Sequence, residues 1–319
     1  MAAPCFAKTD WAVILGGSSG FGLATARELA ARGMSLCLAH RDRRGAMERI
    51  GPEFEWIRGL GGALLTFNAD ALDRTVRGRV LGDLAEAMGA EGRVRVLLHS
   101  IAYGNLKLIA PEAPARSAAI APLAQLATDL AVDEAELAAR VDRLFGEGHD
   151  GLHALASPPA YPASSFIDED DLSLTIHSMG TSLLGWTQEI LRRRLFAADA
   201  RVFGLTSEGN ALAWKGYAAV AAAKVALESV ARSIAVEMAP YGIRCNVIQA
   251  GVTDTPALRL IPGAEHLKAQ ARLRNPFGRL TTPQDVARVI ALLSMDEAAW
   301  INGDVIRVDG GEHVSGLTR

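Results

Sequence analysis

The stretch Trp11-Ala-Val-Ile-Leu15-Gly16-Gly-Ser-Ser-Gly20-Phe-Gly22 decides how this chain folds. Its apolar first half is long enough for a buried parallel strand, and the strand stops at a glycine-rich turn. Leucine and alanine then recur at helical spacing as far as Gly33, and a second apolar run occupies residues 35–39. A strand, a glycine-rich turn, a helix and a strand within about 30 residues make a βαβ unit. Such glycines let the backbone approach a pyrophosphate, whose charge meets free N–H groups at the helix start, so we favour a nucleotide site over a turn without a ligand.

A basic cluster follows the second strand of this unit. At that point a doubly wound fold reads the adenosine ribose, and an acidic residue there would bind a free 2′-hydroxyl. This chain offers His40-Arg41-Asp42-Arg43-Arg44, which suits a 2′-phosphate. The cluster favours NADP(H) over NAD(H), with Arg41 as the contact because it follows the strand most closely. A solvated charge run is the alternative, and Asp42 leaves room for it.

Strands and helices alternate through most of the remaining sequence. Apolar runs predict strands at residues 63–67, 93–98, 200–205, 243–248 and 305–308. Helical periodicity lies between them at residues 76–88, 174–195, 217–238 and 283–293. Small or polar residues follow two of the strands, at Asp70-Ala71 and His99-Ser100-Ile101-Ala102, on the edge where open α/β sheets bind ligands. The sequence therefore predicts an α/β fold, a Rossmann-like doubly wound parallel sheet in a single domain over residues 1–319.

The alternation breaks between about residues 105 and 172. Six prolines bracket one clear helical segment, residues 132–145, and the block ends in the acidic run 168–171. We interpret the block as an inserted, mainly helical cap and not as a second domain with its own core. A lid on a substrate pocket and an oligomer contact are both compatible with its apolar helical face.

Composition limits the function classes. The chain has 319 residues, 50% of them hydrophobic, and a net charge of -3, which gives no general attraction to nucleic acid or to an anionic membrane. Cys5, Cys37 and Cys245 have no paired spacing and are expected to be buried, reduced thiols. Residues 1–10 lack the pattern of a secretion signal, and no apolar stretch is long enough to cross a bilayer. We expect a cytoplasmic protein without a membrane insertion.

Tyr217-Ala-Ala-Val-Ala-Ala-Ala-Lys224 carries the candidate chemistry. Its two ionisable side chains stand seven apart in a predicted helix, which is almost two turns, so they share one face. The residues between them are small, and a flat ligand could therefore meet a phenol at one end and an ammonium at the other. An alanine-rich core helix with one buried Tyr and one snorkelling Lys is the alternative.

These motifs together resemble the short-chain dehydrogenase/reductase family over nearly the whole chain except residues 105–172. The resemblance rests on the glycine turn, Asp70, the segment 99–102, the Tyr217 and Lys224 pair, the loop Ala250-Gly-Val-Thr-Asp-Thr255 and Val308-Asp-Gly-Gly311. It implies Tyr217 and Lys224 as catalytic residues. The cofactor-binding residues that it implies are Gly16, Ser18, Ser19, Gly20, Phe21, Gly22, Arg41, Asp70, Ala71, Ser100, Ile101, Ala102, Thr206, Tyr217, Lys224, Gly251, Val252, Thr253 and Thr255.

Departures from the usual family pattern point to one branch. Ordinary members place Lys four residues after Tyr, but that position is Ala221 here, and Lys224 lies about one turn, ~5 Å, further along. The longer spacing resembles the enoyl-acyl carrier protein reductases of fatty-acid synthesis, and so does the segment His99-Ser-Ile. The glycine turn is of the ordinary short-chain type, as in the NADPH-using variant of those reductases.

The spacing has a chemical reason. In ketone reduction the hydride lands on the carbon whose oxygen the Tyr protonates. In reduction of a trans-2-enoyl thioester the hydride lands on Cβ while the charge appears on the thioester oxygen, so the phenol must be displaced. The resemblance thus implies NADPH-dependent reduction of the enoyl double bond, with Tyr217 stabilising the enolate and Lys224 holding the nicotinamide ribose. It also implies an acyl carrier protein as the partner that delivers the thioester, and a homo-oligomer, a tetramer or a dimer.

Two further positions differ from the usual relay. Gly204 stands where the family has a serine, about thirteen residues before Tyr217, although Thr206 and Ser207 are close by. His177 takes the place of the helix Asn and is expected to be a packed or cofactor-side residue. Alternative functions are a 3-oxoacyl-thioester or other carbonyl reductase, and a catalytically silent dinucleotide-binding protein.

Other candidates for sites are weaker. His149 and His153 are four apart, but their neighbouring glycines make a helix doubtful, and we expect no metal site. The acidic run 168–171 is expected to be a solvated loop or a helix cap. Basic residues at 192–194 and 272–279 could meet an acidic carrier protein, although ordinary helix surface is the simpler interpretation.

Overall fold

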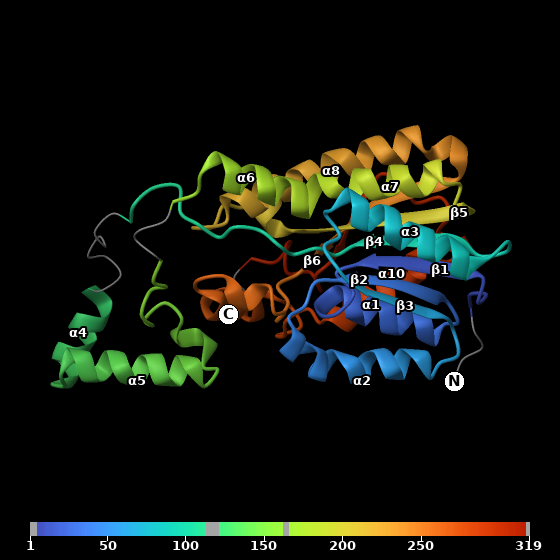
Figure 1. Ribbon diagram of the computed structural model, residues 1–319. Coiled ribbons are helices and arrows are strands. Elements are labelled where there is room, and N and C mark those ends of the chain that lie inside the picture. The colour runs from blue at the N-terminus through green and yellow to red at the C-terminus, as the bar shows by residue number, and fades with distance from the viewer. Residues whose placement is uncertain (1–4, 113–120, 162–165, 317–319) are drawn as a thin grey trace.

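The computed structural model describes residues 5–112, 121–161 and 166–316, and a parallel sheet runs through its centre (Figure 1). Its seven strands follow the order β3-β2-β1-β4-β5-β6-β7. The order reverses between β1 and β4, which is the switch point of a doubly wound fold. The predicted fold class is therefore confirmed. The strands are β1 (Asp10–Leu15), β2 (Ser35–His40), β3 (Leu64–Asn68), β4 (Arg93–His99), β5 (Phe196–Ser207), β6 (Ile243–Ala250) and β7 (Val305–Val308).

Two apolar layers cover the two faces of the sheet. In β1, Val13 and Leu15 pack into one layer, whereas Ala12 and Ile14 pack into the other. Both faces are buried, and this is why the strands appear in the sequence as continuous apolar runs. The first layer contains α3 (Arg74–Met88), α7 (Ser182–Arg192) and α8 (Ala218–Glu237). The second contains α1 (Gly20–Ala31), α2 (Met47–Arg58) and α10 (Pro283–Leu293).

Capping interactions mark the starts of two helices. The helix at 283–293 was predicted to the residue, because Thr282 accepts from the Asp285 amide, Asp285 reciprocates, and Pro283 opens the first turn. The acidic run also caps a helix: Asp168 and Asp171 form the same reciprocal pair at the start of α6 (Glu169–Ile176). A short π-helical segment, His177–Thr181, joins α6 to α7.

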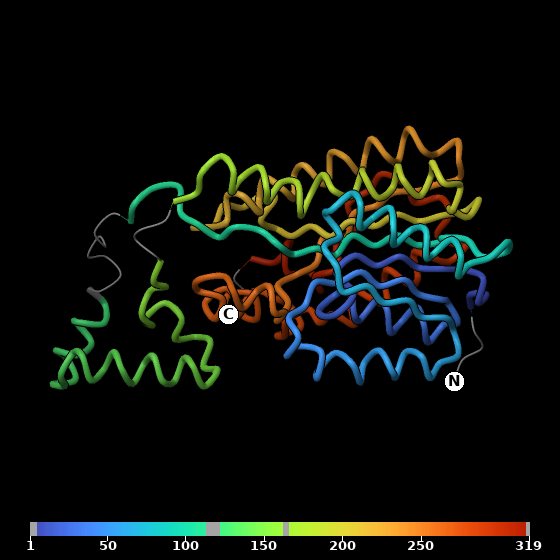
Figure 2. The backbone as a smooth tube through the Cα atoms, viewed as in Figure 1, coloured from blue at the N-terminus to red at the C-terminus, as the bar shows by residue number. Residues whose placement is uncertain are grey.

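A helical segment stands apart from the sheet layers. It contains α4 (Ala121–Leu130) and α5 (Glu134–Gly146), and Figures 1 and 2 show both at one end of the molecule, away from the strands. The chain leaves β4 along α6, where the Asn105 amide donates to Thr175 Oγ1 at 2.9 Å. Residues 108 and 166 then form an isolated parallel bridge, so the outgoing and returning chains lie side by side.

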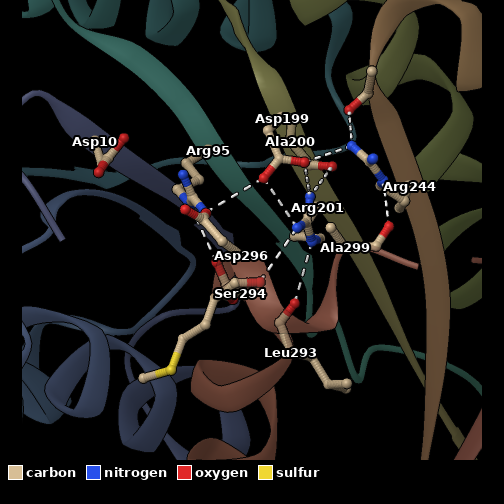
Figure 3. A network of polar contacts seen from close by, with 12 residues as sticks. Asp10, Arg95, Asp199, Ala200, Arg201, Arg244, Leu293, Ser294, Asp296 and Ala299 are labelled. Carbon is tan, nitrogen blue, oxygen red and sulfur yellow. Dashed lines mark hydrogen bonds and ion pairs between the residues drawn. The ribbon is translucent and has the colours of Figure 1, made fainter. Parts of the chain in front are cut away.

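An arginine network ties the amino ends of the central strands together (Figure 3). Asp199 of β5 accepts hydrogen bonds from Arg95, Arg201 and Arg244, which lie on β4, β5 and β6. Arg201 is fully buried and also donates to the carbonyl oxygen of Leu293. These contacts lie at the sheet edge opposite the glycine turn, and they fix the strand register there.

Two composition-based expectations can be checked against the described residues. Cys37 and Cys245 are buried as expected, but Cys5 is exposed, so the expectation was wrong for that residue. It lies in the segment before β1 and does not belong to either of the two apolar layers among the described residues. No helix in the described ranges is long and apolar enough to cross a membrane.

Candidate active site

The glycine turn after β1 forms a cradle that admits no side chain. Gly16 has a φ of 86°, and a Cβ there would lie 2.4 Å from the carbonyl oxygen of Ser100, the first residue after β4. A Cβ on Gly22, in the first turn of α1, would lie 2.1 Å from the Gly16 carbonyl oxygen. The turn, the helix start and the end of β4 therefore approach one another as closely as backbones can. This is the geometry that a pyrophosphate needs at the switch point.

Two adjoining cavities run along the carboxyl edge of the sheet from this cradle. The first has a volume of about 340 Å³ and the second a volume of about 190 Å³. Both are lined by the residues at the boundary between them: Phe21, Ser100, Ile101, Ala102, Thr255, Ala257 and Leu260. Of the residues predicted to bind a cofactor, the first cavity also has Gly16, Ser18, Ser19, Gly20, Arg41, Asp70 and Ala71 in its wall. The second has Thr206, Tyr217, Lys224, Gly251, Val252 and Thr253.

Arg41 lines the first cavity. Its guanidinium bonds Asp70 Oδ2 at 3.0 Å and stacks over the Tyr103 ring, 4.2 Å from the ring centre. Asp42 lines the same cavity, but its carboxylate accepts from His40 Nδ1 at 2.9 Å. Both carboxylates thus have partners, and the stacked guanidinium is presented at the cavity edge.

Tyr217 and Lys224 meet in the second cavity. Tyr217 stands one residue before α8, as its N-cap, and Lys224 lies two turns into the helix. Both side chains are buried. The Tyr217 hydroxyl lies 3.4 Å from Ser207 Oγ, and the Lys224 ammonium donates to the Leu205 carbonyl oxygen at 2.9 Å. The end of β5 therefore holds both groups, one on each side of Thr206.

The protonation states of Tyr217 and Lys224 make the phenol a hydrogen-bond donor and the lysine a cation. Burial raises the pKa of Tyr217 above its usual 10, and the Ser207 hydroxyl opposes this effect. Burial lowers the pKa of Lys224 to about 8, and the nearby Glu228 carboxylate opposes that change. At neutral pH the phenol keeps its proton and the amine its charge. His99 is neutral, because burial lowers its pKa to about 3.

Glu228 supports the strand end from α8. It lies four residues after Lys224 and accepts from Thr206 Oγ1 at 2.5 Å and from Asn210 Nδ2 at 2.6 Å. The Thr206 hydroxyl is therefore turned toward a carboxylate, while the rest of the residue lines the cavity. Sequence reasoning did not single out Glu228, although its position one turn after Lys224 was visible in the helix periodicity.

Ser207 is the hydroxyl that the sequence left unassigned. Counting thirteen residues back from Tyr217 leads to Gly204, but Gly204 is buried under α8, where an added Cβ would lie 3.0 Å from Leu227. Counting from Lys224 with the ordinary spacings leads instead to Ser207. The structure places that hydroxyl beside the phenol.

His177 does not have the packed position expected of it. It is exposed in the π-helical segment, and its Nδ1 lies 3.3 Å from Thr181 Oγ1. It does not appear among the described residues that line the two cavities. His99 is the packed histidine here, since it is buried and its Nε2 lies 2.8 Å from Ser182 Oγ.

A charged cluster in the second cavity was not foreseen. Arg274 bonds the carboxylates of Glu208 and Glu312, and the other oxygen of Glu312 accepts from the Val252 amide at 3.2 Å. Burial raises the pKa of Glu312, and Arg274 opposes this effect. His313 Nδ1 is buried without a hydrogen-bond partner in the part of the chain that the structure describes, and it lies 3.4 Å from a Glu208 oxygen. Residues 208, 274 and 312 are far apart in sequence, so no local pattern could reveal the cluster.

The remaining candidates have structural roles. No cluster of three or more potential metal ligands occurs within residues 5–112, 121–161 and 166–316. Several arginines of the basic segments are already paired: Arg193 with Glu189, Arg272 with Asp150, and Arg279 with Asp285. These pairings favour ordinary protein surface for both segments, with Arg279 in the loop between α9 (Ala264–Arg274) and α10.

A nucleotide cradle that leads to a buried phenol and ammonium defines a dinucleotide-dependent oxidoreductase. A family model described as enoyl-(acyl carrier protein) reductase matches residues 124–313. The chain therefore belongs to this enoyl-(acyl carrier protein) reductase-like branch of the short-chain dehydrogenase/reductase family.

Curated relatives have several activities. Cis-4-hydroxycyclohexanecarboxylate dehydrogenase of Sinomonas cyclohexanicum is 30% identical over 56% of this chain and 72% of its own length. The NADH-dependent enoyl-[acyl-carrier-protein] reductase of Aquifex aeolicus is 34% identical over 43% of this chain and 50% of its own length. 1-Cyclohexenylcarbonyl-CoA reductase of Streptomyces collinus is 36% identical over 37% of this chain. This match spans 43% of the Streptomyces protein, and two of these three matches thus cover half of the relative or less.

Solved structures agree with the fold. The Aquifex aeolicus enoyl-[acyl-carrier-protein] reductase superposes with a TM-score of 0.69 at 21% identity, over 97% of this chain and 98% of that one. A short-chain dehydrogenase from Burkholderia cenocepacia in complex with NADP has a TM-score of 0.66 at 21% identity, over 96% and 98%. At these identities the likeness concerns the fold alone.

Proposed function

We propose that this protein reduces the carbon–carbon double bond of a trans-2-enoyl thioester with NADPH. The observation that carries the proposal is the position of the phenol. Tyr217 precedes α8 and reaches Ser207, while Lys224 lies two turns into the helix in the same cavity. The phenol is thus displaced from its ordinary position four residues before the lysine, which Val220 occupies within α8. Among the relatives, reductases of enoyl, dienoyl and cyclohexenylcarbonyl groups support the same chemistry.

The cofactor fits the residues that are present. The side-chain-free cradle of Gly16 and Gly22 would hold the pyrophosphate at the start of α1. Arg41, stacked on Tyr103, would meet the 2′-phosphate that distinguishes NADPH from NADH. Lys224 would bind the ribose hydroxyls next to the nicotinamide. When bound, the cofactor supplies the hydride.

Tyr217, Ser207 and Lys224 stabilise the negative charge that hydride transfer would produce on the substrate. Hydride addition at Cβ leaves negative charge on the thioester oxygen. The protonated Tyr217 hydroxyl donates a hydrogen bond to that oxygen, and Ser207 orients the phenol. The Lys224 charge stabilises the same region, and the apolar wall of the cavity excludes water. A proton from solvent completes Cα.

Tyr217→Phe tests the assignment, with the exposed Tyr241→Phe as a matched control. NADPH oxidation with crotonyl thioester should fall by about 10²–10³ in Tyr217→Phe, because one oxyanion donor is lost. NADPH affinity, measured by fluorescence, should fall far less than turnover does, because Lys224 and the glycine cradle remain in place. If Tyr217→Phe reduces crotonyl and longer enoyl thioesters as fast as wild type, the assignment is wrong.

A carbonyl reductase is the second candidate, since Ser207, Tyr217 and Lys224 form a hydroxyl, phenol and ammonium set. Relatives of this kind include the 3-oxoacyl-[acyl-carrier-protein] reductases of Pseudomonas aeruginosa and Escherichia coli. Turnover of acetoacetyl thioester without turnover of any enoyl thioester would establish that the protein is a carbonyl reductase. Binding of NADPH without turnover on either substrate would indicate a catalytically silent protein.

The setting that we propose is acyl-chain synthesis in the cytoplasm, such as fatty acid biosynthesis, with the thioester carried by acyl carrier protein. We also propose a homo-oligomer, a homotetramer or a dimer. Exposed apolar side chains on α6, α7 and α8, among them Leu174, Leu184 and Val225, support this assembly. Light scattering after size-exclusion chromatography tests it, and a monomer at micromolar concentration would contradict it.

A further inference from the structure

A third pocket adjoins the catalytic cavity. It has a volume of about 250 Å³ and shares Glu208, Trp214, Val252 and Leu267 with that cavity, so these residues lie at the boundary between the two spaces. Its remaining wall consists of His153, Leu212, Gln270, Ala271, Leu273 and Arg274. The pocket therefore lies between the catalytic cavity, α9 (Ala264–Arg274) and the helical segment 121–161.

The helical segment is fixed to α9 by specific contacts. Arg272 of α9 bonds both carboxylate oxygens of Asp150, each at 2.5 Å. The His266 ring lies 4.7 Å from the Phe145 ring, and its Nε2 lies 3.1 Å from the Ser157 carbonyl oxygen. A bidentate, partly buried ion pair with two further contacts gives the segment a defined seat. His153, which lies between Asp150 and Ser157, is thereby held in the pocket wall.

The pocket combines apolar walls with polar groups that can bind a ligand. Leucine and tryptophan side chains give it apolar surface, while His153 and Gln270 offer a donor and an acceptor each. Arg274 does not offer a free positive charge, because Glu208 and Glu312 already bond it. Within the wall Glu208 balances Arg274, so an anionic ligand would lose its hydration there without gaining a free positive partner.

We propose that this pocket holds the distal part of the acyl substrate, and that it selects neutral acyl groups that carry a hydroxyl or oxo oxygen. The inference rests on the proposed function for the identity of the substrate. An apolar cavity of about 150 Å³ holds one benzene molecule, so the catalytic cavity accommodates a short acyl segment or a ring. A longer acyl group must continue past Trp214 and Leu267, where it meets His153 and Gln270.

The test compares thioesters of one length: trans-2-octenoyl, 8-hydroxy-trans-2-octenoyl and the corresponding ω-carboxylate, with crotonyl as the short reference. The wild-type kcat/KM should favour the hydroxy compound over octenoyl by about five- to tenfold, the value of one hydrogen bond, and the carboxylate should be poorest. His153→Leu should abolish this preference and leave crotonyl turnover unchanged. His149→Leu is the matched control, because His149 is exposed and lies outside the described pocket wall.

Two results would overturn the inference. One is a wild-type enzyme that reduces octenoyl thioester as well as the hydroxy compound. The other is a His153→Leu variant that slows crotonyl and hydroxyoctenoyl thioesters equally, which would mean a structural role only. Gln270→Leu, at an exposed position of α9, provides a second variant should His153→Leu fail to fold.

Calorimetry separates this inference from the proposed function. The affinities of octanoyl and 8-hydroxyoctanoyl thioesters for the protein with NADP+ are measured without turnover. If no enoyl thioester is reduced, the proposed function fails. Tighter binding of the hydroxyacyl compound, lost in His153→Leu, would still support the pocket, and equal binding would refute it.

Discussion

Lys224 is the buried group whose replacement tests the electrostatics of the site most directly. Its ammonium is almost out of contact with water and donates to the Leu205 carbonyl oxygen at 2.9 Å. Burial lowers its pKa from 10.5 to about 8. The folded protein thus holds this proton less tightly than the unfolded chain does, and the charged lysine opposes folding. We expect Lys224→Met to stabilise the protein without cofactor at pH 7 while it weakens cofactor binding.

The size of the effect follows from the pKa. The difference between 10.5 and about 8 is about 2.5 units, or about 3 kcal/mol at 1.36 kcal/mol per unit. Methionine fills a similar volume, but the variant loses the hydrogen bond to Leu205, which lowers its stability by about 1 kcal/mol. The net gain in the free energy of unfolding is therefore about 2 kcal/mol at pH 7. The cost of the charge is fully present below pH 8 and disappears as the pH rises from about 8 to 10.5, because the folded state releases its proton first.

Urea unfolding of wild type and Lys224→Met at pH 7, 8 and 9 measures this difference. The advantage of the variant should shrink by about 1 kcal/mol between pH 7 and pH 9, since other titrating groups cancel in the comparison. Lys215→Met, at an exposed lysine paired with Glu112, should show no such pH dependence. A Lys224→Met protein that is less stable than wild type at pH 7, or whose advantage grows with pH, would refute the reasoning.

Three further predictions concern the cradle, the ribose end and the arginine network. Gly22→Ala should destabilise the protein by about 1–3 kcal/mol and abolish NADPH binding. Gly45→Ala, with open space around its Cα, should do neither. Thermal melts measure the stability of both variants, and fluorescence titration measures their NADPH binding. Arg41→Ala should weaken NADPH about tenfold or more and leave NADH unchanged, and equal losses for both cofactors would contradict a 2′-phosphate contact. Asp199→Asn should cost about 2–3 kcal/mol in urea unfolding, because buried Arg201 loses its carboxylate, with NADPH affinity unaffected at the opposite sheet edge.

The strands and most of the large helices could be predicted because their patterns are local. Strands buried on both faces are continuous apolar runs, as in β1, and the Thr282 capping pair marks the start of α10. The helix α2 was missed because Gly51 and Pro52 interrupt its periodicity, and α9 because five of its residues are charged or histidine among small ones. Pattern reasoning detects a helix by a broad apolar face, and α9 lacks one.

In the site too, local motifs could be predicted from the sequence, whereas contacts between distant segments could not. The glycine turn and the Tyr217 and Lys224 pair each lie within one short segment, so their residues could be named from the sequence. The contacts that shape the substrate side join distant segments: Asp150 with Arg272, and Glu208 with Arg274 and Glu312. Such pairs leave no periodicity, and only the fold brings them together. Sequence patterns therefore named the residues of the glycine turn and of the Tyr217 and Lys224 pair, but not the charged cluster that lies across distant segments.

The relative positions of Ser207, Tyr217 and Lys224 indicate the chemistry of the site. The ordinary family spacings put the serine thirteen residues before Tyr and the lysine four after it, which is seventeen between serine and lysine. Ser207 and Lys224 keep that separation, so only Tyr217 has moved, by three residues toward the amino end of α8. It has left the helix and approaches Ser207 as the N-cap residue. A general loosening of the site would have displaced all three groups. Displacement of the phenol alone is what a reaction requires when charge develops on an oxygen three bonds away from the carbon that accepts the hydride.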